Sequence, residues 1–291
     1  MKPALPGASA DPFFLESSPG QRFCLFHPPA PGPCRGAVLY VHPFADEMNK
    51  SRRVAALQAR ALAAAGFGVL QIDLYGCGDS SGDFSDARWD LWKQDLAAGH
   101  QWLSDRLGQP VSLLGLRLGA LLALDYACAC ALPLAGLVLW QPVQNGAIFL
   151  KQFLRLLTAG EILSEDKESN KSAAGLSLRD TLIGGQMLEV GGYEIAPELG
   201  AAIDRLDAAH LAVTTCPVAW FEVVSALDRP ESVAVTKLTA RWRDQGVALQ
   251  MHRAVVTAFW ATQEIAEAPD LVAATTQVLL QNSHELSRTW A

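Results

Sequence analysis

Apolar runs alternate with amphipathic segments along most of the chain. The runs without polar alternation, each typical of a strand buried on both faces, lie at residues 36–44, 67–76, 111–116 and 136–142. Between them, apolar residues recur at helical spacing over residues 50–65 and 88–107. Parallel strands need crossover connections of this length. The pattern therefore predicts an α/β protein with a mostly parallel sheet and helices on both faces.

The two ends of this pattern differ from its middle. Residues 12–29 read as two short strands about a Pro-Gly turn, which predicts an antiparallel edge. Residues 143–213 contain amphipathic helical pieces and two Gly-Gly pairs, with no buried strand apparent. Apolar strand and helix patterns then resume. We predict one α/β core from residues 1–142 and 214–291, with residues 143–213 inserted as a lid.

Composition narrows the class of protein. Of 291 residues, 50% are hydrophobic and 18% charged, which allows a large core and excludes a disordered chain. The net charge of −7, without a basic block, argues against a nucleic-acid partner. The six cysteines form no CxxC pair, and no apolar run is long enough to span a membrane. We expect a cytoplasmic protein with reduced thiols, without a metal or other cofactor.

The order of these elements resembles the α/β-hydrolase fold over essentially the whole chain. More narrowly, the segments VHPFADEMNKSRR, DLYGCGDSSGDF and GLRLGA are similar to the exosortase-associated hydrolase 2 family. Proteins of that family resemble esterases and accompany bacterial exopolysaccharide and exosortase sorting systems. The resemblance implies a hydrolase-like protein with its site at a strand-to-helix elbow.

The elbow departs from the pattern of active hydrolases. Such enzymes carry Gly-x-Ser-x-Gly, whereas residues 115–119 read Gly-Leu-Arg-Leu-Gly, with Arg117 at the nucleophile position. A guanidinium stays protonated and is no nucleophile, which excludes an acyl-enzyme there. Asp228 occupies the acid position, although it serves equally well as a solvated helix cap. The expected base position falls at residues 259–260, and the nearest histidine, His252, lies inside a predicted strand. We predict that triad catalysis is lost.

The remaining features of the elbow suit an anion. The resemblance implies that the backbone N–H groups of Phe44 and Leu118 form the oxyanion site. Arg117 adds a full positive charge at a helix N-terminus, a combination that favours a carboxylate, phosphate or sulfate. A structural ion pair is an equally weighted alternative for Arg117. The candidate partners for that pair are Asp46, Glu47 and Asp228.

Three functions stay open at this point. The first is a protein that binds a small anionic or acyl ligand without classical hydrolysis. The second is an active ester or thioester hydrolase or acyltransferase, using Cys77 paired with His42, or a water activated by His42 or His252. The third is a scaffold that contacts a protein partner through the lid. An open pocket lined by Arg117 would favour the first function. A nucleophile and a base within hydrogen-bond distance of each other would favour the second, and a filled pocket with an exposed apolar lid would favour the third.

Overall fold

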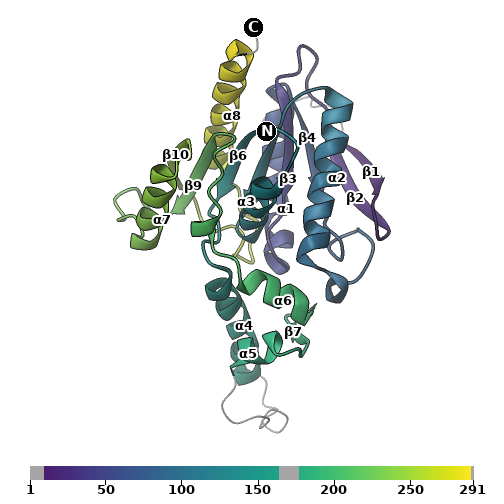
Figure 1. Cartoon of the computed structure of the whole chain (residues 1–291), viewed down its shortest axis with the longest axis vertical. Helices are drawn as coiled ribbons and strands as arrows, with labels where there is room; N and C mark the ends of the chain where they lie inside the picture. The colour runs from purple at the N-terminus through teal and green to yellow at the C-terminus, as the bar shows by residue number, and fades with distance from the viewer. Residues whose placement is uncertain (1–9, 164–176, 290–291) are drawn as a thin grey trace.

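A twisted sheet forms the centre of the molecule. The computed structural model describes residues 10–163 and 177–289. The sheet has the strand order β1-β2-β4-β3-β5-β6-β9-β10 (Figure 1). Its strands are β1 (Asp11–Glu16), β2 (Gln21–His27), β3 (Gly36–Val41), β4 (Phe67–Ile72), β5 (Val111–Leu116), β6 (Leu134–Trp140), β9 (Val218–Val224) and β10 (Leu249–Val255). The pairs β1–β2 and β2–β4 are antiparallel and the others parallel, which confirms the predicted sheet and its antiparallel edge.

Helices cover both faces of this sheet. The two that pack on one face are α1 (Asp46–Ala64) and α8 (Pro269–Thr289), and those on the other face are α2 (Trp89–Leu107), α3 (Leu118–Ala129) and α7 (Val233–Asp244). Successive residues of β3 divide between the two cores: Val38 faces α1 and α8, and Leu39 faces α2 and α3. None of the helices described in residues 10–163 and 177–289 is long and apolar enough to cross a membrane.

The segment between β6 and β9 lies at the end of the molecule opposite to the end of α8 (Figure 1). It contains the helices α4 (Gly146–Leu163), α5 (Leu178–Ile183) and α6 (Pro197–Asp204) and the hairpin of β7 (Leu188–Val190) and β8 (Tyr193–Ile195). The sequence analysis did not predict this hairpin, whose strands each bury one residue, Val190 and Ile195. Strands of three residues are too short to show a period. That the segment acts as a lid stays a prediction.

The strand order reverses at β3. Strand β3 pairs with both β4 and β5, because α1 leads from β3 to one side and α2 crosses back to the other. The last residue of β3, Val41, lies opposite Gly115 of β5. Open α/β sheets bind ligands at such a point, where the strand order reverses.

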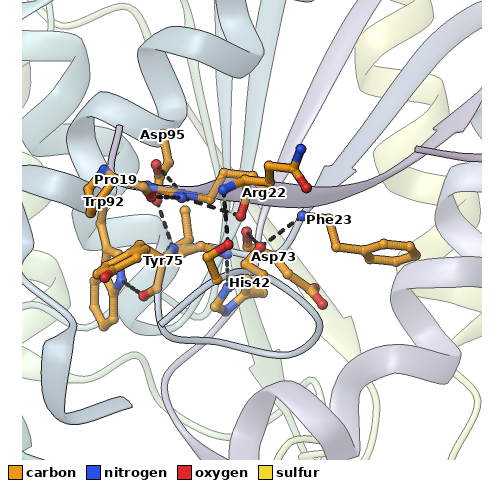
Figure 2. Close-up of polar contacts among 12 residues, drawn as sticks. Pro19, Arg22, Phe23, His42, Asp73, Tyr75, Trp92 and Asp95 are labelled. Atoms are coloured by element: carbon orange, nitrogen blue, oxygen red, sulfur yellow. Dashed lines mark hydrogen bonds and ion pairs between the residues drawn. The ribbon is translucent and has the colours of Figure 1, made fainter. Parts of the chain in front are cut away.

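A buried ion pair attaches the antiparallel edge to α2 (Figure 2). Nε of Arg22 lies 2.6 Å from Oδ1 of Asp95, and both side chains are fully buried. The other carboxylate oxygen of Asp95 accepts the backbone N–H of Tyr75 at 2.8 Å, and Nη1 of Arg22 donates to the carbonyl of Pro19 at 2.7 Å. These contacts hold the loop after β4 between the edge hairpin and α2.

We expect Asp95→Ala to lower the free energy of unfolding by about 3–5 kcal/mol, because it leaves the Arg22 guanidinium buried without its counter-ion. Asp105→Ala is the matched control, since Asp105 is an exposed carboxylate on the same helix. Its effect should stay within about 0.5 kcal/mol. Urea denaturation of both variants measures the difference. Equal stability of the two variants would show that the ion pair contributes nothing.

Candidate functional site

The turn between β5 and α3 consists of Arg117 alone. Strand β5 ends at Leu116 and α3 begins at Leu118, and Arg117 adopts φ 56° and ψ −118°. A non-glycine residue in such a conformation costs about 1–3 kcal/mol and persists only where its neighbours impose it. Here the N–H of Arg117 donates to the carbonyl of Trp140 at 3.0 Å, and its carbonyl accepts the N–H of Val143 at 3.2 Å. Hydrogen bonds to β6 and the loop after it thus hold the strained turn.

Two glycines permit this turn. A Cβ on Gly119 would lie 2.3 Å from the carbonyl oxygen of His42 and 2.5 Å from that of Val41, and a Cβ on Gly115 would lie 2.5 Å from Cα of Ala120. All three contacts are with backbone, which cannot rotate away as a side chain does. The ends of β3 and β5 and the first turn of α3 therefore touch directly, as expected for the elbow.

The guanidinium of Arg117 has one paired side and one open side. Its Nε lies 3.4 Å from Oε1 of Glu47, and its Cζ lies 5.4 Å from the centre of the Trp260 ring. Burial raises the pKa of the Glu47 carboxyl, and the charge of Arg117 opposes that shift. No hydrogen bond among the described residues uses Nη1 or Nη2 of Arg117. Of the three predicted carboxylate partners, Glu47 is the one that the structure brings to the elbow.

The acid and base positions hold no coupled pair. Asp228 lies in the exposed loop after β9 and forms no ion pair among the described residues. Residues 256–268, which follow β10, contain no histidine. Phe259 and Trp260 are buried there, and the ring of Phe259 packs on that of Trp140 with the centres 6.3 Å apart. Aromatic packing thus occupies the place predicted for the base.

His252 lies too far along the sheet to serve the elbow. Strand register places it beside Phe221, which pairs with Trp140, which pairs with Leu116. Three strand spacings of about 4.8 Å separate the backbones of His252 and Leu116 by about 14 Å. The imidazole stacks on Phe221 with the ring centres 4.6 Å apart, and burial lowers its pKa. The sequence correctly placed His252 inside a strand.

His42 and Cys77 lie near the elbow, but neither is arranged for catalysis. Nε2 of His42 accepts the N–H of Leu74 at 3.2 Å, and Nδ1 lies 2.8 Å from the carbonyl of Pro43. Both contacts are satisfied when Nδ1 carries the proton, so neither nitrogen is free to act as a base. Burial lowers the pKa of His42 and raises that of Cys77, which keeps the imidazole neutral and the thiol protonated. No hydrogen bond joins the two side chains in the described chain.

The expected oxyanion donors and Arg117 line different spaces. Phe44 and Leu118 line a cavity of about 10 Å³, which holds about one water molecule. The ring of Phe44 packs against Phe149 and Phe153 of α4, with centres 5.7 and 5.0 Å away. We expected Arg117 and the two N–H groups to converge on one ligand. Arg117 is not among the residues that line this small cavity, and aromatic rings of α4 pack on the ring of Phe44, so a ligand that contacts all three residues stays a prediction.

Arg117 instead lines an open cleft of about 580 Å³ between α4 and α7. Its charged lining residues are Arg117, Asp207, Lys237 and Arg241. The carboxylate of Asp207 is already engaged, since it accepts the amide of Asn145 at 3.2 Å and the N–H of Ala209 at 2.8 Å. The lining is therefore predominantly cationic.

Gln141 is a residue of this cleft that sequence reasoning missed. Its φ is 41°. Among the described residues, the non-glycine residues with positive φ are Ala45, Arg117 and Gln141, and they follow the adjacent strands β3, β5 and β6, respectively. The N–H of Gln141 donates to the carbonyl of Phe221 at 2.8 Å, and its side-chain oxygen accepts the N–H of Val223 at 2.7 Å. Nothing in the local sequence signals this conformation, because contacts with β9 impose it.

Comparison with known proteins settles the fold. Residues 32–171, slightly less than half of the chain, match the model of a family described as serine aminopeptidase, S33. Among solved structures, Est1E from Butyrivibrio proteoclasticus with bound ferulic acid aligns over 94% of this chain and 98% of its own, with a TM-score of 0.67 and 13% identity. The protein has the α/β-hydrolase fold. No curated protein sequence matches it significantly.

Further α/β-hydrolase structures align over the whole chain. A soluble variant of monoglyceride lipase from Saccharomyces cerevisiae covers 98% of this chain and 97% of its own, with a TM-score of 0.60 and 13% identity. Proline iminopeptidase from Mycobacterium smegmatis aligns over 95% of this chain and 100% of its own, with a TM-score of 0.58 and 16% identity. Likeness at these identities concerns the fold. The exosortase-associated family stays a prediction.

The α/β-hydrolase fold defines what Arg117 replaces. In active hydrolases the central residue of the elbow is the nucleophile, held by the same strained turn. The turn is present here with an arginine at its centre. Within the described part of the chain, no group of three or more histidine, cysteine, aspartate and glutamate side chains is arranged to hold a metal ion.

We expect neither the wild-type protein nor Arg117→Ser to hydrolyse p-nitrophenyl esters above background or to react with a fluorophosphonate. The substitution supplies a hydroxyl, but His252 is about 14 Å away and His42 is engaged on both nitrogens. Stopped-flow assays and mass spectrometry of the labelled protein measure the two outcomes. Esterase activity of Arg117→Ser well above wild type would show that a histidine reaches the elbow.

Proposed function

We propose that this protein is a member of the α/β-hydrolase fold, of the exosortase-associated hydrolase 2 type, that binds an anionic or acyl ligand without Ser-His-Asp hydrolysis. The observation that carries this proposal is the orientation of Arg117, whose Nε side is paired and whose Nη1 and Nη2 lack hydrogen bonds within the described chain. The residue lines an open cleft large enough for a small organic molecule.

The contacts of Arg117 suit recognition of a carboxylate or phosphate. Glu47 pairs with the Nε edge of the guanidinium, and the guanidinium carbon lies over the Trp260 ring, so the other edge is oriented before a ligand arrives. Two parallel N–H bonds from that edge match the oxygens of a carboxylate or phosphate. Each charge-assisted bond contributes about 1.5–3 kcal/mol.

The shape of the site favours this function over the two alternatives. The large space lies beside Arg117, whereas the cavity beside Cys77 and His42 measures only about 10 Å³. An acyl group would therefore lie along the cleft, over apolar side chains such as Leu238. Among the described residues of the segment between β6 and β9, Ile148 and Met187 are exposed large hydrophobic residues, which is compatible with a protein partner. A cytoplasmic location is part of this proposal, and the six free cysteines are compatible with it.

We expect small carboxylates and phosphates to raise the melting temperature of the wild type in proportion to the logarithm of their concentration above Kd. Arg117→Ala should abolish this shift, and Arg60→Ala, which removes an exposed arginine on α1, should keep it. Thermal-shift series at fixed ionic strength measure both. A shift that persists unchanged in Arg117→Ala would mean that Arg117 serves only as the ion-pair partner of Glu47.

We expect Glu47→Gln to strengthen anion binding by about two- to fivefold, because it removes the carboxylate that competes for Arg117 while keeping an amide oxygen beside Nε. Asp46→Asn is the control, since Asp46 is an exposed neighbour paired with Lys50. Isothermal titration with one carboxylate measures both variants. Unchanged or weaker binding in Glu47→Gln would show that Glu47 orients Arg117 more than it competes with the ligand.

A further inference from the structure

Helix α7 adds positive charge to the cleft beyond the charge of Arg117. Lys237 and Arg241 lie on α7 and line the same cleft as Arg117. Residues four apart on a helix project from one face, about 5–6 Å apart at Cβ. The two cations are therefore presented side by side to the cleft.

Neither cation is neutralised by the protein itself. The ion pairs among the described residues include neither Lys237 nor Arg241. Nη2 of Arg241 lies 3.5 Å from Nδ1 of His210, which is no counter-ion. Asp207, the carboxylate of this cleft, is held by Asn145 and by a backbone N–H. Like charges one turn apart on a helix repel each other, and a bound anion would relieve this repulsion.

We infer that the ligand of this cleft carries two anionic groups, one bound by Arg117 and the other by Lys237 and Arg241. This inference rests on the proposed function, because it places the first anionic group on Arg117. Arginine offers a planar fork and lysine a mobile point charge, a pair that suits a carboxylate or a phosphate. Apolar side chains, among them Val143 and Leu238, also line the cleft. The ligand class is therefore a dianion whose charged ends are joined by a partly apolar spacer.

The two ends of such a ligand cooperate only when its spacer fits. Once one end is bound, the second binds at an effective concentration that depends on the length of the spacer. A dicarboxylate of the right length should therefore bind more tightly than a monocarboxylate with the same number of carbons. Shorter and longer dicarboxylates should lose this gain.

The test compares α,ω-dicarboxylates from succinate to suberate with monocarboxylates of equal length, by isothermal titration at fixed ionic strength. For wild type we expect the best dicarboxylate to bind at least about tenfold more tightly than its monocarboxylate. Lys237→Ala/Arg241→Ala should remove this gain while keeping the monocarboxylate affinity. Arg243→Ala, which removes an exposed arginine of α7 outside the cleft lining, should keep both. Arg117→Ala should remove binding of the monocarboxylate.

Two outcomes overturn the second subsite while leaving the proposed function intact. One is that monocarboxylates bind through Arg117 and no dicarboxylate of any length binds more tightly. The other is that the gain survives in Lys237→Ala/Arg241→Ala. If Arg117→Ala leaves monocarboxylate binding unchanged, the proposed function itself fails, and with it the two-point ligand. Circular dichroism checks that each variant is folded, as we expect for Lys237, Arg241 and Arg243, which are exposed side chains of α7.

Discussion

Direct backbone contact at Gly119 is the constraint on which this site depends. Because the first turn of α3 rests on the carbonyl groups of Val41 and His42, the chain has one residue in which to turn from β5 into the helix. That residue must adopt a positive φ, whatever its side chain. The same close contact is what exposes a nucleophile in an active hydrolase. In this protein it places Arg117, with its charge, at the position where such a hydrolase carries its nucleophile.

The groups around Arg117 compensate for that replacement. Glu47 supplies a carboxylate and Trp260 an aromatic face, and each contacts the guanidinium from a different element. Trp260 belongs to the loop after β10, where the base of a triad is expected. Aromatic rings of α4 close the space beside Phe44 on the other side. Packing and charge pairing thus surround Arg117 with contacts from three parts of the chain.

The distribution of space follows from the same packing. The side of the elbow that would receive an acyl group is filled, and the open volume lies between α4 and α7. Under the proposed function, an anion that enters that volume meets the guanidinium of Arg117 and the cations of α7. The buried pair of Arg22 and Asp95 acts at a distance from this cleft, where it fixes the loop after β4 that carries Cys77. This ion pair and the charged residues that line the cleft therefore occupy separate parts of the molecule.

Local pattern was enough to predict the fold. The apolar runs that became β3 to β6, the helix that became α7 and the glycines of the elbow are short-range signals, because burial and tight turns constrain residues close in sequence. The strand position of His252 and the aromatic filling at Trp260 followed from the same pattern.

The hairpin of β7 and β8 was missed because a strand of three residues is too short to show a hydrophobic period. The partner of Arg117, the strain at Gln141 and the separation of the Phe44 and Leu118 donors from the cleft depended on residues distant in sequence. Only tertiary packing decided these three features, because the partner of a side chain and the volume of a cavity depend on how helices and strands that are distant in sequence pack against each other.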